Sequence, residues 1–133
     1  GIATSSLGRA WRTADMVALI TGCPIDRGDA RLRERGFGTY ENKRKPAGGT
    51  LWAREDEGTE PLDAFARRTV AGLNDALTHG CPLIVAHGGT RHVLLLTLGL
   101  DVPDSALNNA VPLVFERLRN GWHVMVLDQG ASD

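Results

Sequence analysis

The fold of this chain is decided by the stretch Pro82-Leu83-Ile84-Val85-Ala86-His87-Gly88-Gly89-Thr90-Arg91-His92-Val93-Leu94-Leu95-Leu96. Its first half is an apolar run, bounded by Gly80 and Pro82, that is too short for an isolated helix and predicts a fully buried strand. After a His-Gly-Gly turn comes a Leu-rich run that ends at Gly99, a residue suited to a helix C-terminus. The pattern therefore predicts a strand, a glycine turn and a helix.

The corner between this strand and helix is a candidate anion site. In open α/β sheets, ligands bind beyond the carboxyl ends of the strands, and backbone N–H groups at a helix start favour negative charge. His87 stands at this corner, where its side chain is placed to contact a phosphate. A structural histidine with a satisfied hydrogen bond is the alternative, and so short a motif does not decide between the two.

Length and composition indicate one globular domain, residues 1–133, with a real core. The apolar share of 42% and the net charge of −1 give no indication of a nucleic-acid partner or a membrane-surface partner. No apolar run has the length of a membrane span and no signal peptide is evident, so we expect a cytoplasmic protein. Cys23 and Cys81 form neither a zinc pattern nor a disulfide framework. The chain starts at Gly1 without a Met, so we expect either a cut or a missing N-terminal segment.

Helical spacing predicts a first helix that runs to about Thr21, with N-cap candidates at Thr4, Ser5 and Ser6. Its buried stripe is expected to consist of Leu7, Ala10, Trp11, Ala14, Val17 and Ala18. Arg9 lies in the first turn, off this stripe. A cation there opposes the helix dipole, which favours a functional role over helix stability, with a solvated arginine as the alternative.

The rest of the chain is predicted to contain one irregular region, one more helix and a hairpin. Residues 22–58 look irregular, and 42–58 is expected to be a surface loop. The next helix is expected to begin at Glu60 and Pro61 and to end at Gly80, with Arg67 and Arg68 solvated. Strands at 111–118 and 122–127 flank an Asn-Gly turn, and 128–133 is expected to be a frayed tail.

Four ordered motifs resemble the histidine phosphatase superfamily, which has the phosphoglycerate mutase-like fold. They are Ser5-Ser6-Leu7-Gly8-Arg9-Ala10-Trp11-Arg12-Thr13-Ala14, Leu32-Arg33-Glu34-Arg35-Gly36-Phe37-Gly38-Thr39-Tyr40-Glu41, the helix from Glu60 through Phe65 to Arg68, and Ala86-His87-Gly88-Gly89-Thr90 followed by Asn109-Ala110. The resemblance covers essentially the whole chain. It implies a three-layer α/β/α fold with a mostly parallel sheet and a C-terminal antiparallel hairpin.

The resemblance also implies a mechanism. In this family a histidine of an Arg-His-Gly motif is transiently phosphorylated, a second histidine and two arginines hold the phosphoryl oxygens, and a carboxylic acid protonates the leaving oxygen. By motif, His87 is the second histidine, Arg9 a clamp arginine and Glu34 the acid, with Gly88 beside the phosphate. From the residues alone, Glu34 is equally explained as a carboxylate that neutralises Arg33 and Arg35.

The chain departs from the family pattern at three places. It contains no Arg-His-Gly, so we expect the nucleophilic histidine in a missing βα unit of about 30 residues that precedes Ser5. His92 stands where the family often has arginine, and Arg91 is displaced by one residue, about 100° around a helix. Asn42 replaces a glycine. A sheet without its first strand would expose an edge, so we expect this chain alone to be unstable or to rely on a partner.

Together with the resemblance, these observations predict a phosphomonoesterase of the phosphatase branch of the family. We expect it to act through phosphohistidine on a small phosphorylated substrate. The alternatives are a non-catalytic phospho-ligand binding protein or inactive truncated member, and phosphoglycerate mutase-type phosphoryl transfer. A nucleotide-binding domain is disfavoured because no Gly-x-Gly-x-x-Gly pattern is present. No cofactor and no metal site are predicted, since His87 and His92 lack ligand spacing. A homodimer is left open.

Overall fold

The computed structural model describes residues 1–43, 55 and 58–127. Most of the predicted surface loop at 42–58 and all of the predicted tail at 128–133 lie outside the described residues. Two compact units make up the chain, Gly1–Thr90 and Arg91–Asp133. Each unit is described by itself, and the expectation of a single domain stays a prediction.

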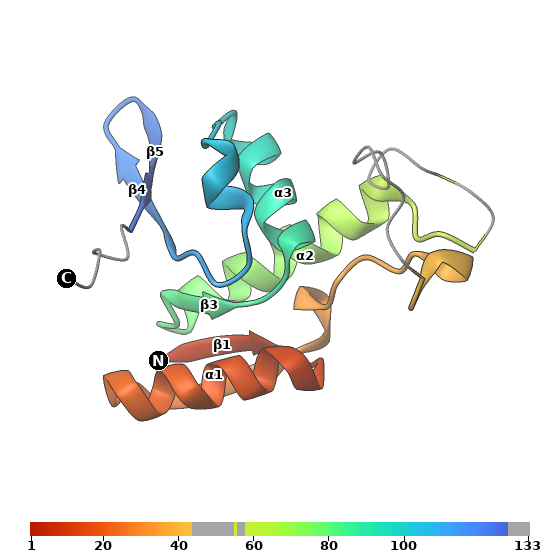
Figure 1. Cartoon of the computed structure of the whole chain (residues 1–133). Coiled ribbons are helices and arrows are strands. Elements are labelled where there is room, and N and C mark those ends of the chain that lie inside the picture. Colours follow the sequence, from red (N-terminus) through yellow and green to blue (C-terminus); the bar gives the residue numbers. More distant parts are fainter. Residues whose placement is uncertain (44–54, 56–57, 128–133) are drawn as a thin grey trace. The chain divides into compact units, whose positions relative to one another are not determined.

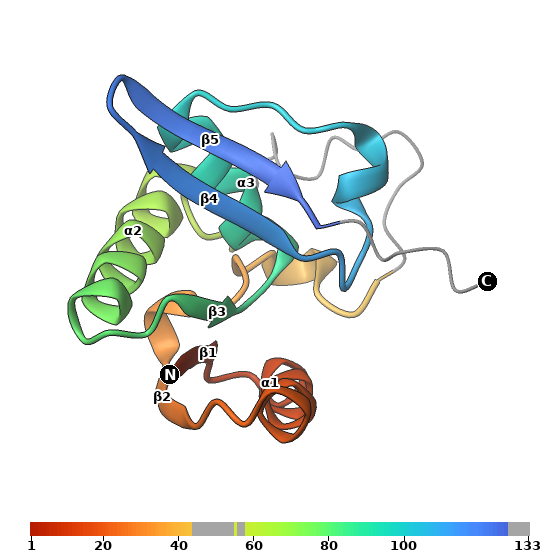
Figure 2. The same cartoon turned by 90° about the vertical axis from the view of Figure 1, so that its left-hand side faces the viewer.

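The first unit is an α/β arrangement (Figure 1). Its elements are β1 (Ile2–Ser5), α1 (Gly8–Thr21), β2 (Ile25–Asp29), the 3₁₀ helices η1 (Ala30–Leu32) and η2 (Gly38–Tyr40), α2 (Leu62–Thr78), β3 (Leu83–Val85) and the start of α3 (Gly88–Leu98). The three strands form a parallel sheet in the order β2-β1-β3. Helices α1 and α2 lie on opposite faces of this sheet, as Figures 1 and 2 show from two directions.

The central strand β1 was not predicted from the sequence. All four of its residues are buried, because strands pair with both of its edges and helices cover both of its faces. The expected N-cap at Thr4, Ser5 or Ser6 is therefore wrong: these residues belong to the strand and the bend after it, and Leu7 is the N-cap of α1. The end of α1 at Thr21 is confirmed, and Gly22 closes the helix with a left-handed φ of 72°.

Strand β2 was also missed, in a segment that was predicted to be irregular. Its sequence Ile-Asp-Arg-Gly-Asp has no alternating pattern, and pairing with β1 makes it a strand. Gly28 is required there because a Cβ at this position would lie 2.6 Å from the ring of Trp11 on α1. Trp11 is 36% exposed, so the predicted buried stripe of α1 is confirmed only in part, with Ala10 and Ala14 as its buried members.

Helix α2 matches its prediction closely. Pro61 is the N-cap, and the helix packs inward through Phe65, Thr69, Gly72, Leu73 and Ala76. Gly72 allows a close approach to η1, since a Cβ there would lie 3.1 Å from a methyl group of Leu32. Helix α2 thereby holds the segment that follows β2.

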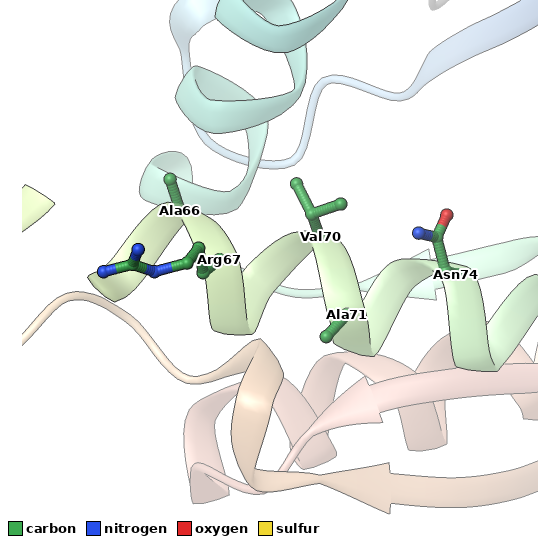
Figure 3. Close-up of a pocket in the computed structure, with 5 residues that line it drawn as sticks. All are labelled: Ala66, Arg67, Val70, Ala71 and Asn74. Atoms are coloured by element: carbon green, nitrogen blue, oxygen red, sulfur yellow. The ribbon is translucent and has the colours of Figure 1, made fainter. Parts of the chain in front are cut away.

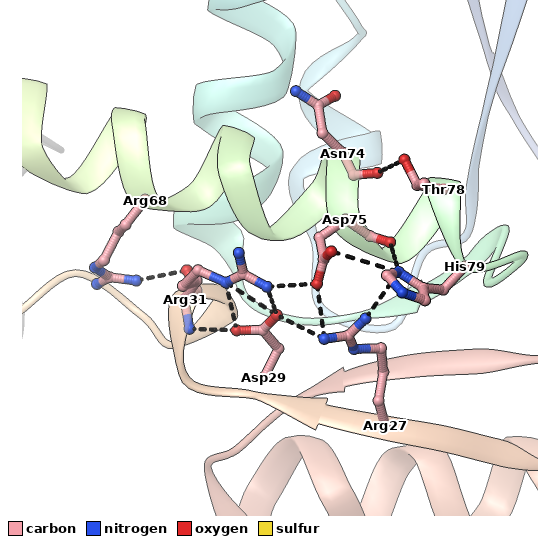
Figure 4. A network of polar contacts seen from close by, with 8 residues as sticks. All are labelled: Arg27, Asp29, Arg31, Arg68, Asn74, Asp75, Thr78 and His79. Carbon is pink, nitrogen blue, oxygen red and sulfur yellow. Dashed lines mark hydrogen bonds and ion pairs between the residues drawn. The ribbon is translucent and has the colours of Figure 1, made fainter.

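A network of ion pairs joins β2, η1 and α2 (Figure 4). Arg31 Nη2 lies 2.7 Å from Asp29 Oδ2 and 2.6 Å from Asp75 Oδ2. Arg27 Nη2 lies 2.7 Å from the same Asp75 oxygen. Asp29 also caps η1 by accepting a hydrogen bond from Arg31 N at 2.8 Å. This network places the chain from Ala30 onward against α2.

Strand β3 is confirmed, but its predicted full burial is wrong. Leu83 is 36% exposed, and Ile84 and Val85 are half-buried. Among the described residues β3 pairs with β1 alone, so β3 is an edge strand of this sheet. Its apolar side chains are only partly covered because no strand pairs with its other edge in this part of the chain.

The second unit contains the rest of α3, the 3₁₀ helix η4 (Asp104–Leu107) and the antiparallel pair β4 (Leu113–Leu118) and β5 (Gly121–Val126). Gly99 follows α3 with a φ of 64°, which confirms the predicted helix end. Leu118 pairs with Gly121, so Arg119 and Asn120 form the hairpin loop. The predicted hairpin is thus confirmed, with its turn one residue earlier than the predicted Asn120-Gly121.

Candidate phosphate site

His87 and Ser5 meet at the carboxyl end of the parallel sheet. Ser5 is the last residue of β1 and is fully buried, whereas His87 follows β3 and is half-buried. Because β1 and β3 are parallel neighbours, their ends bring the two side chains together, with His87 Nε2 2.7 Å from Ser5 Oγ. The histidine is thus held where the sequence placed it, at the strand-to-helix corner.

The surroundings of His87 disfavour its charged form. Burial, with smaller contributions from the charges of Arg9, Arg33 and Arg68, lowers the pKa of His87 from 6.5 to about 4. His87 is therefore neutral near pH 7. Arg68 is paired with Glu60, so the uncompensated positive charge near His87 comes from Arg9 and Arg33, and an anion would offset it.

Arg9 supplies one of these charges from the first turn of α1. Its side chain is exposed, and within residues 1–43, 55 and 58–127 its guanidinium forms no hydrogen bond or ion pair. A cation at a helix N-terminus has no favourable interaction with the helix dipole. Its charge acts on His87, and its role as a phosphate-clamp arginine stays a prediction.

Glu34 lies beside the start of α3. Its Oε1 accepts a hydrogen bond from Arg35 N at 3.0 Å, and its Oε2 accepts one from Gly89 N at 3.4 Å. The second contact connects the carboxylate to the turn that carries His87. The alternative role of neutralising Arg33 and Arg35 receives no support from these contacts, which are both to backbone N–H groups. Gly88 begins α3 at the same corner and is exposed.

The segment that carries Arg33 and Glu34 is positioned by Arg68, which the sequence analysis wrongly placed in solvent. Arg68 Nη1 donates to the carbonyl oxygens of Arg31 and Arg33, both at 2.8 Å, and Nη2 donates to that of Glu34 at 3.1 Å. Its remaining donors pair with the carboxylate of Glu60 at 2.6 and 2.7 Å. This bidentate partner, together with a hydrogen bond from Gly36, lowers the pKa of Glu60.

Arg33 and Ser5 are members of this cluster that sequence reasoning did not assign to the site. Arg33 was considered only as a neighbour of Glu34, and Ser5 only as a helix cap. The available indication for Ser5 was its place in the same motif as Arg9, at the end of a short apolar segment. No local pattern identifies Arg33, because its proximity to His87 depends on how α2 holds the chain.

Arg91, the arginine displaced by one residue from the family position, is held by contacts of its own. Within the second unit it donates to the carbonyl oxygens of Ala106, Leu107 and Asn108 at 3.3, 2.9 and 3.4 Å. These bonds satisfy the end of η4. The expectation that Arg91 need not substitute for the family arginine stays a prediction.

Asn42, the other departure, is compatible with the backbone that it occupies. Its φ is 61°, a left-handed conformation that glycine adopts freely and that asparagine tolerates better than most residues. A glycine at this position would adopt the same conformation without strain.

One surface hollow in the first unit lies apart from this cluster. A shallow hollow on α2 is lined by Ala66, Arg67, Val70, Ala71 and Asn74, none of which belongs to the cluster (Figure 3). Across the described residues, no group of three or more His, Cys, Asp or Glu side chains is arranged to hold a metal ion. No helix in that part of the chain has both the length and the apolar character needed to cross a membrane.

Comparison with known proteins identifies the family. The family model described as the histidine phosphatase superfamily (branch 1) matches residues 1–128. The chain therefore belongs to the histidine phosphatase superfamily, as the sequence motifs predicted.

Curated relatives agree with this assignment. The chain is 33% identical to probable phosphoglycerate mutase GpmB of Klebsiella pneumoniae, over 79% of this chain and 55% of the relative. Identity to the Shigella boydii GpmB is also 33%, over 90% of this chain and 59% of that protein. The chain thus spans somewhat more than half the length of these relatives.

The same fold is seen in solved structures. The fold resembles that of Bacillus stearothermophilus YhfR, with a TM-score of 0.72 at 24% identity, covering 95% of this chain and 72% of that one. It also resembles a mycobacterial glucosyl-3-phosphoglycerate phosphatase, with a TM-score of 0.67 at 22% identity, covering 94% and 75%. These similarities confirm the predicted α/β fold with a parallel sheet and a C-terminal antiparallel hairpin.

Proposed function

We propose that this chain forms the phosphate-binding part of a phosphomonoesterase that acts on small phosphate esters through a phosphohistidine intermediate. The observation that carries the proposal is the neutral, half-buried His87, which lies in the field of three arginines at the carboxyl end of the sheet. Phosphoryl transfer depends mainly on positioning and on stabilisation of negative charge, and this corner supplies both.

Each residue of the cluster has a role in this proposal. Arg9 and His87 bind the non-bridging oxygens of the phosphoryl group, together with the exposed N-terminus of α3 at Gly88. Glu34 donates a proton to the leaving oxygen, because its carboxyl group is fixed beside the His87 turn. Arg68 positions Glu34 through its backbone carbonyl and does not itself contact the substrate.

In this proposal the nucleophile is the histidine of an Arg-His-Gly motif, and residues 1–133 contain no such motif. Of the remaining histidines in the first unit, His79 contacts Asp75 at the C-terminal end of α2, where its Nδ1 lies 2.7 Å from the Asp75 carbonyl oxygen. His92 lies in α3 and His123 in β5. In the proposed reaction the nucleophile takes the phosphoryl group as the ester oxygen leaves with the Glu34 proton, and water then releases phosphate.

A non-catalytic phospho-ligand binding protein is the second candidate, and the absence of an Arg-His-Gly motif from these residues favours it. Mutase-type transfer is a third, supported by the names of the GpmB relatives. The three are separated by incubating the full-length protein, including any segment that carries an Arg-His-Gly motif, with a phosphate ester. Acid-labile phosphohistidine with release of phosphate supports the phosphatase, transfer to a second acceptor supports the mutase, and binding without either supports the binding protein.

The phosphate site itself is tested by replacing His87 with alanine. We expect His87→Ala to weaken the binding of inorganic phosphate or vanadate at least tenfold, because a hydrogen-bond donor to an anion is lost. Calorimetric titration measures the affinity. His123→Ala is the matched control, since His123 is exposed on β5 and its replacement leaves affinity unchanged. Unaltered affinity of His87→Ala would contradict the proposal.

A further inference from the structure

The hydroxyl group of Ser5 lies in a setting that determines where its proton points. Ser5 is 0% exposed, so its hydroxyl has no access to solvent. Its oxygen accepts a hydrogen bond from Leu7 N at 3.3 Å and lies 2.7 Å from His87 Nε2. The helix cap is Leu7 and has no side-chain cap bond, so Ser5 does not serve α1 as a cap.

Counting donors and acceptors assigns the direction of the Ser5–His87 bond. A serine hydroxyl has one proton to donate and two lone pairs that accept. The Leu7 N–H occupies one lone pair, and a buried hydroxyl proton left without an acceptor is costly. In the described part of the chain the available acceptor is His87 Nε2. The Ser5 hydroxyl therefore donates to Nε2, and the ring proton of the neutral imidazole resides on Nδ1.

We propose that Ser5 is a positioning residue that holds His87 in the Nδ1–H tautomer, so that the imidazole presents a hydrogen-bond donor to a phosphoryl oxygen. The phosphoryl ligand rests on the proposed function, whereas the tautomer follows from the hydrogen bonds of the Ser5 hydroxyl. Within the described residues Nδ1 makes no hydrogen bond, so its N–H is available to a ligand.

The tautomer decides whether His87 attracts or repels an anion. Near pH 7 the ring is neutral, because burial and the nearby arginines lower the pKa of His87 to about 4. A neutral ring with its proton on Nε2 would direct the Nδ1 lone pair at a phosphoryl oxygen, and two acceptors cannot form a hydrogen bond. Ser5 removes this alternative by occupying Nε2. The arginines supply the positive charge of the site, while His87 supplies a hydrogen-bond donor with a fixed orientation.

The test begins with the unaltered full chain and needs no ligand. Histidine labelled with ¹⁵N is studied by long-range ¹H–¹⁵N correlation at pH 7, with His87 assigned by its absence in His87→Gln. We expect Nδ1 in the spectral region of protonated ring nitrogens and Nε2 in that of unprotonated ones. A spectrum of the Nε2–H form, or of two forms in fast exchange, would overturn the proposal.

Variants then separate positioning from folding. Ser5→Ala is expected to give a mixture of tautomers and about tenfold weaker binding of inorganic phosphate. Ser6→Ala, an exposed neighbour, is the matched control and leaves both unchanged. Ser5→Cys keeps the volume with a weaker donor and is expected to restore the tautomer in part. A single Nδ1–H form and full affinity in Ser5→Ala would overturn the role of Ser5.

The two proposals fail in different ways. If the unaltered chain shows the Nδ1–H form but binds no phosphate, the proposed function is wrong and the phosphoryl contact falls with it, while Ser5 still sets the tautomer. If it binds phosphate with the proton on Nε2, the function stands and the role of Ser5 is overturned.

Discussion

Two clusters of arginine in the first unit use the same side chain for opposite purposes. Between β2, η1 and α2, Arg27 and Arg31 pair with Asp29 and Asp75 (Figure 4). At the carboxyl end of the sheet, Arg9 and Arg33 are exposed and, among the described residues, their guanidinium groups have no carboxylate partner. The first cluster balances its own charge, and the second does not.

The titratable groups show the consequence of this difference. In the paired cluster, hydrogen bonds and charge from Arg31 lower the pKa of Asp29 and of Asp75, which strengthens their ionised forms. In the other cluster the arginines help to lower the pKa of His87, which suppresses its charged form. Paired arginines therefore hold the fold together, whereas unpaired arginines keep a site positive and open to an anion.

The largest expected effect comes from breaking the paired cluster at its buried member. Asp29 is 7% exposed, and Asp29→Ala removes both the ion-pair partner of Arg31 and the cap of η1. We expect the free energy of unfolding in urea to fall by about 2 to 3 kcal/mol. Asp63→Ala is the control: it breaks an exposed pair with Arg67 and is expected to cost below about 1 kcal/mol. Equal effects would remove the distinction between the clusters.

The unpaired cluster is tested by phosphate affinity. Arg9→Ala is expected to weaken binding of inorganic phosphate by about tenfold, because a charge-assisted bond to the anion is lost. Stability in urea should change little, since Arg9 is exposed and its guanidinium forms no hydrogen bond or ion pair with the described residues. Arg12→Ala, an exposed arginine on the same helix, is the matched control. The idea that Arg9 belongs to the site fails if both variants bind phosphate equally well.

A smaller effect is expected on the pH dependence of stability. The pKa of His87 is lowered from 6.5 to about 4, so between these pH values the unfolded chain binds a proton that the folded chain does not. This group therefore reduces stability progressively as the pH falls from 6.5 to 4 and has no effect above 6.5. Asp29 and Asp75 add their loss below 3.8, because their pKa values are lowered from there. Urea unfolding at pH 7, 5.5 and 4.5 measures the first change, which His87→Gln should remove.

Arg33→Gln refines the same measurement. Removing one positive charge is expected to raise the pKa of His87 toward its usual value, so the loss of stability between pH 6.5 and 4 becomes smaller than in the unaltered chain. Arg67→Gln is the control, because Arg67 pairs with Asp63 on the exposed side of α2. An unchanged His87 titration by NMR in Arg33→Gln would show that Arg33 does not belong to the cluster.

Much of the fold was predictable because it depends on local patterns. Helix α2, the strand–turn–helix around His87, the end of α3 at Gly99 and the hairpin all follow from periodicity and from the backbone preferences of glycine and proline. Strands β1 and β2 were missed because neither has an alternating pattern of its own. They are strands because each pairs with a neighbour that is distant in sequence or separated by a helix.

For the site, the sequence by itself determined the residue types and their approximate places: a histidine and two glycines after a strand, an arginine in a first helical turn and a glutamate before a glycine-rich bend. Only the tertiary structure decided which arginines are paired and which are not. Arg68, predicted to be in solvent, donates to the backbone carbonyl oxygens of Arg31, Arg33 and Glu34. Ser5, predicted only as a helix cap, contacts His87. The physical reason is that hydrogen-bond partners and electric fields depend on distances through space, which local sequence patterns do not encode.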